Sequence, residues 1–205
     1  MYSAFALLAL AFTGIASALP TIQKRDPPTS PGCVGLGGGA FDNISSFTLA
    51  AYNKTLPNAN STGAPLVLGQ AGAIVGASFK VLSTYASYPY DDYPGLTMVN
   101  GGIVRGDSLV GTNITAGRFP GFILTGIDLP PPAQIYCGLA STSAHGGGTG
   151  FPKLAAFGDT ESWSLCPNGN GPFKQVNVVY KATPDNFGSY IYDQCYAVDL
   201  QIIEN

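Results

Sequence analysis

Ser108 is the residue whose surroundings most suggest covalent chemistry. It stands in the string Gly106-Asp107-Ser108-Leu109. A serine hydroxyl is a weak nucleophile until a neighbouring base takes its proton, and that base is usually a histidine oriented by a carboxylate. The chain has a single histidine, His145, and the residue three positions before it is Thr142 rather than an acid. The partners that would activate Ser108 are therefore missing from the sequence.

The same string is the nucleophile motif of the GDSL esterases and lipases, whose histidine closes a D-x-x-H block that this chain lacks. The run HGGG at 145–148 forms oxyanion holes elsewhere, but the G-x-S-x-G elbow that it serves is absent. The tripeptide Arg105-Gly106-Asp107 of integrin ligands is interpreted as a coincidence. We predict no catalytic residue, and the GDSL esterase is the disfavoured alternative.

A second polar cluster occupies the segment YASYPYDDYPG at 85–95. Tyrosine rings next to carboxylates suit sugars, which offer an apolar face and a rim of hydroxyls. The predicted carbohydrate-binding residues are Tyr88, Tyr90, Asp91, Asp92 and Tyr93. The alternative is an exposed connecting turn without a ligand. Two adjacent aspartates supply too few oxygens for Ca²⁺, so neither a metal nor a cofactor is predicted.

The N-terminal segment predicts secretion. Residues 1–18 read as a signal peptide that ends in Ala-Ser-Ala, and residues 19–25 read as a propeptide that ends at the dibasic pair Lys24-Arg25. A Gly/Pro-rich arm is predicted over 26–45 and an all-β domain over 46–205. The expected localisation is therefore extracellular or in the cell wall.

Glycosylation sequons agree with this localisation. Four segments have the acceptor form Asn-x-Ser/Thr, which marks a surface position when it is used. The predicted sites are Asn43, Asn53, Asn60 and Asn113.

Four cysteines in a secreted chain predict two disulfides, for which three connectivities are available. We favour Cys166 with Cys195, which would join the last strand-like runs beside Trp163. We then expect Cys33 with Cys137, which would tether the N-terminal arm. The competing pairings join Cys33 to Cys166 or to Cys195.

The charge of the chain excludes some partners. The sequence has 9 basic and 12 acidic residues, and removal of Lys24 and Arg25 leaves seven basic residues and a net charge of −5. No basic cluster remains, which argues against nucleic acid and anionic membranes as partners. We expect a monomer whose partner is a cell-wall polysaccharide.

Strand signals dominate the mature chain, and helix signals are nearly absent. Eleven runs read as strands: 47–53, 65–70, 73–84, 96–99, 102–106, 121–126, 134–139, 153–158, 162–167, 175–182 and 195–203. Asn100-Gly101 marks a tight hairpin because both positions tolerate positive φ. The residues VGTNITAG after Ser108 read as a loop. The expected fold is one compact all-β domain, with a β-trefoil slightly preferred over a β-sandwich.

The C-terminal third resembles a group of small secreted fungal proteins. ESWSLCPNG, QVNVVYKATP and QCYAVDLQI carry the resemblance, over roughly residues 155–203. The group includes cell-wall proteins linked to phialide and conidium development and IgE-binding relatives. The resemblance implies a structural role at the cell wall and supplies no catalytic residue. The sequence therefore predicts a non-catalytic secreted fungal protein, with a lectin-like carbohydrate-binding module as the alternative.

Overall fold

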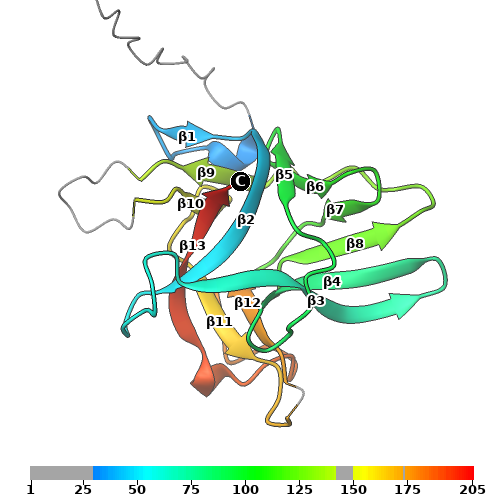
Figure 1. Cartoon of the computed structure of the whole chain (residues 1–205), viewed down its shortest axis with the longest axis vertical. Coiled ribbons are helices and arrows are strands. Elements are labelled where there is room, and N and C mark those ends of the chain that lie inside the picture. The colour runs from blue at the N-terminus through cyan, green and yellow to red at the C-terminus, as the bar shows by residue number, and fades with distance from the viewer. Residues whose placement is uncertain (1–29, 142–149, 173) are drawn as a thin grey trace, which may run out of the picture.

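The structure is a computed structural model that describes residues 30–141, 150–172 and 174–205. The expected signal peptide and propeptide, His145 and the HGGG run lie outside these residues. Thirteen strands and two short 3-10 helices form the described chain (Figure 1). The 3-10 helices are η1 (Pro31–Cys33) and η2 (Tyr192–Gln194). The strands are β1 (Ala40–Phe41), β2 (Ile44–Asn53), β3 (Ala64–Ile74), β4 (Ala77–Thr84), β5 (Leu96–Val99), β6 (Gly102–Arg105), β7 (Leu109–Gly111), β8 (Gly121–Thr125), β9 (Tyr136–Leu139), β10 (Lys153–Ala156), β11 (Trp163–Pro167), β12 (Val176–Tyr180) and β13 (Tyr196–Glu204).

The all-β class is confirmed, but neither the trefoil nor the sandwich is. The strands belong to one antiparallel sheet, in which a circuit of nine strands closes as a barrel. The circuit runs β13-β2-β5-β6-β7-β8-β4-β12-β11 and returns to β13. Strand β3 bridges β2 and β4, and β10, β9 and β1 extend the sheet beyond β13. A sandwich needs two separate sheets, whereas here hydrogen bonds connect every strand to the same one.

The strand predictions differ from the structure at three places. Val110 and Gly111, predicted as loop, belong to strand β7 (Leu109–Gly111), because β7 lies between β6 and β8 and pairs with both. Strand β1 lies within the predicted N-terminal arm and pairs with β9. The predicted run 73–84 contains a turn at Val75-Gly76, so its first residues belong to β3 and β4 begins at Ala77.

The predicted hairpin at Asn100-Gly101 is confirmed. Its two residues join β5 to β6 and have φ values of 49° and 75°. Two central residues with positive φ are typical of a type I′ turn, whose twist matches that of paired strands. Asp42 O accepts a hydrogen bond of 2.9 Å from Gly101 N, so the turn is fixed to the start of β2.

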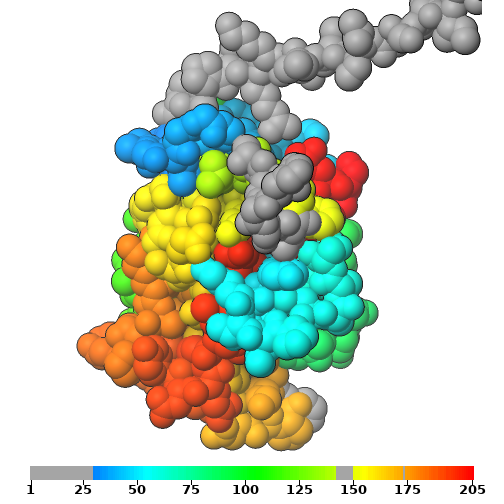
Figure 2. Space-filling view, turned by 90° about the vertical axis from the view of Figure 1, so that its left-hand side faces the viewer, coloured from blue at the N-terminus to red at the C-terminus, as the bar shows by residue number. Residues whose placement is uncertain are grey.

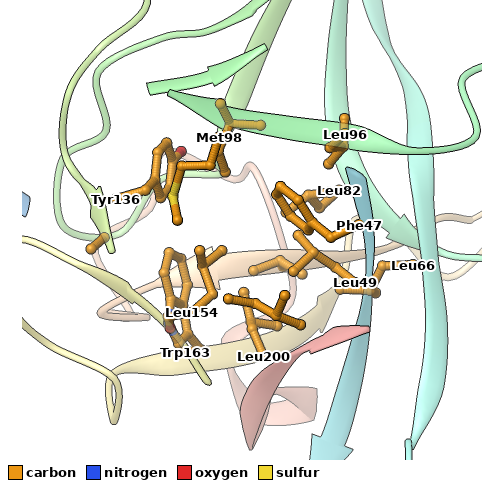
Figure 3. Close-up of a cluster of buried hydrophobic side chains, with 14 of the residues drawn as sticks. Phe47, Leu49, Leu66, Leu82, Leu96, Met98, Tyr136, Leu154, Trp163 and Leu200 are labelled. Atoms are coloured by element: carbon orange, nitrogen blue, oxygen red, sulfur yellow. The ribbon is translucent and has the colours of Figure 1, made fainter. Parts of the chain in front are cut away.

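The core fills the barrel with side chains from alternate strand positions. On β13, Val198, Leu200 and Ile202 are fully buried and point inward. Trp163 lies among these aliphatic residues, and its Nε1 donates a 2.9 Å hydrogen bond to Leu154 O (Figure 3). The Tyr136 hydroxyl is buried without a partner in the described chain, and this burial raises the pKa of the hydroxyl. Alternation between core and outer face therefore determines which residues of each strand reach a functional surface.

Two disulfides join the pairs that the sequence favoured. Cys33 bonds Cys137 and so ties η1 to β9, and Cys166 bonds Cys195 next to the paired strands β11 and β13. The predicted position of the second bond beside Trp163 is wrong. Cys166 is three positions after Trp163, and side chains alternate along a strand, so the two residues face opposite sides of β11. Cys166 packs with Val179 and Tyr190.

Removal of the disulfides tests how they stabilise the barrel. Cys166→Ala with Cys195→Ala opens a loop with a sequence separation of 29, and we expect the free energy of unfolding to fall by about 3–4 kcal/mol. The Cys33–Cys137 bond has a separation of 104, and its removal should cost about 4–5 kcal/mol because the loop is longer. Urea denaturation followed by tryptophan fluorescence measures both. A larger loss for the shorter loop would contradict the loop-entropy explanation.

Candidate functional site

The predicted tyrosine-rich segment is the connection between β4 and β5. Its first residues form a turn in which the backbone nitrogens of Ser87 and Tyr88 both donate to Thr84 O at 3.0 Å. Ser87 Oγ accepts a 2.8 Å hydrogen bond from Val176 N at the start of β12. The segment is therefore held against β12, although 89 residues separate Ser87 from Val176.

Only part of the predicted carbohydrate cluster is available to a ligand. The Tyr90 side chain is 60% exposed and meets Tyr88 in an edge contact, with ring centroids 5.1 Å apart. Asp91 and Asp92 are exposed beside it. The pKa of the Tyr88 hydroxyl is raised by burial and by the charge of Asp92. Tyr90 with its two carboxylates thus forms an exposed aromatic and acidic tip.

Tyr93, at the end of the segment, is half-buried. Its ring has two cations nearby, with Lys80 Nζ 5.4 Å and Arg105 Cζ 5.5 Å from the centroid, and it packs against the core. Tyr93 and Asp91 also border a cavity of about 30 Å³ that is floored by Phe47. This space admits little more than one water molecule. Tyr93 therefore fixes the end of the segment onto the barrel.

A groove of about 500 Å³ lies on the other side of the same segment. Ala86 and Ser87 form one wall, and Tyr196 and Lys174 come from distant parts of the chain. The other lining residues are Ala64, Thr84, Gly171, Pro172 and Val176. The Tyr196 ring is 36% exposed, and partial burial raises the pKa of its hydroxyl. The groove thus combines one aromatic face, a small apolar floor, hydroxyl groups and one cation.

Sequence reasoning missed the groove. Tyr196 and Val176 lie within predicted strands, and Lys174 lies between two of them. The walls meet only because β12 pairs with β4, at Asn177 and Ser83. No spacing pattern in the sequence connects residues 84–87 with 171–176 and 196.

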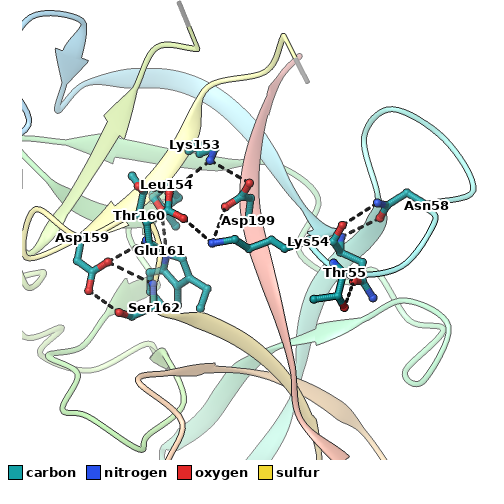
Figure 4. Close-up of polar contacts among 12 residues, drawn as sticks. Lys54, Thr55, Asn58, Lys153, Leu154, Asp159, Thr160, Glu161, Ser162 and Asp199 are labelled. Atoms are coloured by element: carbon teal, nitrogen blue, oxygen red, sulfur yellow. Dashed lines mark hydrogen bonds and ion pairs between the residues drawn. The ribbon is translucent and has the colours of Figure 1, made fainter. Parts of the chain in front are cut away.

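An ion-pair network lies on the outer face of the barrel (Figure 4). Lys54, after β2, pairs with Glu161 and lies 3.7 Å from Asp199 on β13. Lys153 on β10 contacts the same two carboxylates at 3.4 Å and 2.9 Å. Burial lowers the pKa of Lys153, but its ion pairs with Asp199 and Glu161 outweigh that effect and leave the pKa raised. Because each carboxylate faces two ammonium groups, the arrangement suits the connection of four segments rather than proton transfer.

Asp159 positions Glu161, one of the two carboxylates of this network. Its Oδ1 accepts hydrogen bonds from the backbone nitrogens of Glu161 and Ser162, at 2.8 and 3.2 Å. Its Oδ2 accepts a 2.6 Å hydrogen bond from Ser162 Oγ. Burial acts to raise the pKa of Asp159, but these hydrogen bonds favour the charged form and the pKa is lowered overall.

The structure places Ser108 in the turn between β6 and β7. It lines an open groove of about 400 Å³ with Leu124 and Thr125. Within the part of the chain that the structure describes, the Ser108 hydroxyl forms no hydrogen bond. Arg105 of the integrin-like tripeptide donates to Pro94 O at 3.3 Å and lies over the Tyr93 ring. This arginine is thus part of the packing around Tyr93.

Comparisons with family models, curated protein sequences and solved structures give no match for this chain. In the described ranges, no helix has the length and hydropathy required to span a bilayer. Within the same ranges, no three histidine, cysteine, aspartate or glutamate side chains gather as a metal site. The site is therefore interpreted from its own geometry.

The low pKa of Asp159 predicts acid destabilisation. A carboxyl group whose pKa is lower in the folded state contributes stability above its unfolded pKa of about 3.9, and this contribution disappears as the pH falls through the folded value. We expect wild-type protein to lose more stability between pH 6 and pH 2 than Asp159→Asn does. Denaturant unfolding across this range measures the difference, with Asp185→Asn on an exposed loop as the control. Parallel pH profiles for wild type and Asp159→Asn would contradict the assignment.

Proposed function

We propose that this protein is a non-catalytic secreted protein that binds a neutral cell-wall polysaccharide in the groove lined by Tyr196 and the segment 84–87. The observation that carries the proposal is the groove itself, about 500 Å³ in volume and lined by an aromatic ring and by hydroxyl groups. Sugar rings stack on aromatic faces, and their hydroxyls exchange hydrogen bonds with hydroxyl and charged groups.

The exposed tip of the β4–β5 segment extends this site. Tyr90 and its neighbouring carboxylates lie on the same segment whose turn forms the groove wall. A polysaccharide repeats the same sugar units, so one chain can contact the groove and the tip at once. Its affinity then exceeds that of a single sugar, which can contact only one of them. The tip is a secondary contact, since Tyr90 is open to solvent on most of its surface.

Several features of the sequence support secretion. The predicted signal peptide, dibasic processing pair and four sequons belong to a secretory route, and two disulfides are typical of oxidising compartments. The resemblance of residues 155–203 to small secreted fungal wall proteins suggests the cell wall as the location. The low density of basic residues favours a neutral polymer over an acidic one.

Binding is tested with insoluble β-glucan and chitin as the probes. Tyr196→Ala and Tyr90→Ala should each weaken binding about 2- to 10-fold, because an aromatic contact contributes about 0.5–1.5 kcal/mol beyond area burial. Tyr192→Ala is the matched control, since Tyr192 is 40% exposed and does not line the groove. Sedimentation of the bound protein gives the affinities. The proposal would be refuted if Tyr196→Ala and Tyr90→Ala bound as tightly as the Tyr192→Ala control, or if folded wild type did not bind.

The non-catalytic part of the proposal has its own test. Ser108→Ala should leave any hydrolysis of short-chain ester substrates by the purified protein unchanged from wild type, because the sequence lacks the D-x-x-H partner. A chromogenic ester assay measures this, with Ser78→Ala in the same open groove as the control. An esterase activity that disappears in Ser108→Ala alone would show that the protein is an enzyme.

A further inference from the structure

We infer that the mature protein carries N-linked glycans at Asn53 and Asn60, on one loop, and that the sequons at Asn43 and Asn113 are left unmodified. This inference rests on the secretion part of the proposed function and is independent of polysaccharide binding. The four sequons are equivalent in sequence pattern, so the distinction comes from how each asparagine side chain is bonded. The two favoured sites belong to the sequon loop, defined as residues 53–63, which begins at the last residue of β2 and leads into β3.

At Asn53 the sequon closes into a compact turn. Its Oδ1 accepts hydrogen bonds from Thr55 N at 2.9 Å and Thr55 Oγ1 at 3.0 Å, and a third from Leu56 N at 2.9 Å. The hydroxyl of the third sequon residue thus lies against the asparagine amide. The acceptor nitrogen, Nδ2, donates to no group in the described chain and is available for modification.

Asn60 repeats this geometry seven residues later. Its Oδ1 accepts hydrogen bonds from Thr62 N at 3.1 Å, Thr62 Oγ1 at 2.9 Å and Gly63 N at 2.8 Å. The asparagine side chain is exposed, and Nδ2 again donates to no described group. Gly63 has a φ of 86°, which glycine adopts without strain and which lets the loop turn back into β3.

The other two sequons are bonded differently. At Asn43, Nδ2 donates a 2.7 Å hydrogen bond to Asp42 Oδ1, and Oδ1 accepts one of 3.1 Å from Asn100 N. The acceptor nitrogen therefore has a charged partner, and the oxygen is joined to a hairpin rather than to its own sequon. At Asn113, Oδ1 accepts from Ile114 N at 3.0 Å, and within the described residues the Thr115 hydroxyl forms no hydrogen bond to the Asn113 amide.

These differences in hydrogen bonding affect modification because the oligosaccharide is transferred to the chain during secretion. Each bond in the two favoured turns spans two or three residues, and such local contacts form in well under a microsecond, long before distant strands meet. The Asp42 carboxylate is equally local and binds the Asn43 nitrogen from the start. The geometry that distinguishes the sequons is therefore present when the transferring enzyme acts.

The covalent step replaces one N–H bond with an N–C bond. The asparagine Nδ2 attacks the anomeric carbon of a lipid-linked oligosaccharide diphosphate, supplied by the secretory pathway. The carbon–oxygen bond to the diphosphate breaks, the lipid diphosphate leaves, and one Nδ2 proton passes to a base of the enzyme. Hydrogen bonds donated to Oδ1 draw electron density from the amide and make that proton easier to lose.

The sequon loop also has room for two glycans in the folded protein. Figure 2 shows the cyan part of the chain, which includes the residues near 60, at the surface of the molecule. The loop is anchored beneath, because Lys54 pairs with Glu161 and Gln201 Nε2 lies 3.4 Å from Ser61 O. Glycans attached to the exposed side would not disturb these anchors.

Peptide mapping of the full chain, secreted from a yeast host, tests the inference. Enzymatic release of N-glycans in ¹⁸O-water converts each modified asparagine to a labelled aspartate, and we expect the label at Asn53 and Asn60 alone. Thr55→Ala and Thr62→Ala should each remove one glycan, whereas Thr55→Ser, which keeps the hydroxyl, should retain it. Ser45→Ala and Thr115→Ala are the matched controls and should leave the glycan number unchanged.

Two kinds of result would overturn the inference. The first is label at Asn43 or Asn113, and the second is an unmodified Asn53 or Asn60 in chain recovered from the medium. A chain that stays inside the cell contradicts the proposed secretion instead. The same map is then made on the chain preceded by the host's own signal peptide, so that the sequons meet the transferring enzyme. Loss of polysaccharide binding in any variant bears on the groove and not on the glycans.

Discussion

The closure of the sheet through β2 and β4 is the constraint on which the rest of the structure depends. One edge of β2 pairs with β5 near Ile44 and Phe47 and then with β3 over Leu49–Ala51, while the other edge pairs with β13. Strand β4 also changes partner along its length, because it pairs with β8 over Ala77–Val81 and with β12 at Ser83. Each strand changes partner along its length, so two groups of strands share one barrel. Closure also satisfies strand edges that would otherwise pair with other chains.

This closure explains why polar groups are buried on the outside of the barrel. Asp199 and Gln201 alternate with core residues on β13 and so face outward, yet both are almost inaccessible. The Asp199 carboxylate is stabilised by lysines from β10 and the end of β2, because burial of a single unpaired charge would be costly. Asp199 Oδ1 and Gln201 Oε1 still lack hydrogen-bond donors among the described residues, which is the arrangement that ordered water satisfies.

The sequence predicted what short-range patterns determine. Alternation of Val198, Leu200 and Ile202 indicated β13, and Asn100-Gly101 indicated a hairpin, because strand period and turn chemistry are local. The closed barrel was not predictable in this way, since partner changes along β2 leave no mark on its own composition. The surroundings of the candidate site were not predictable for the same reason. Composition marks Tyr93 as a candidate sugar-binding residue, but it gives no sign that Lys80 and Arg105, from other strands, lie near its ring.

The structure also gives a physical reason for the GDSL string that does not involve catalysis. Gly106 has a φ of 54° in the turn after β6, a conformation that glycine adopts without the steric cost of a side chain. Asp107 is exposed in the same turn, where short polar residues are favoured. Leu109 begins β7 and is fully buried in the core. A short hairpin in this barrel requires a glycine, a polar turn residue and a core leucine. Turn geometry and strand burial therefore account for three of the four residues of the GDSL string and leave only Ser108 without a structural requirement.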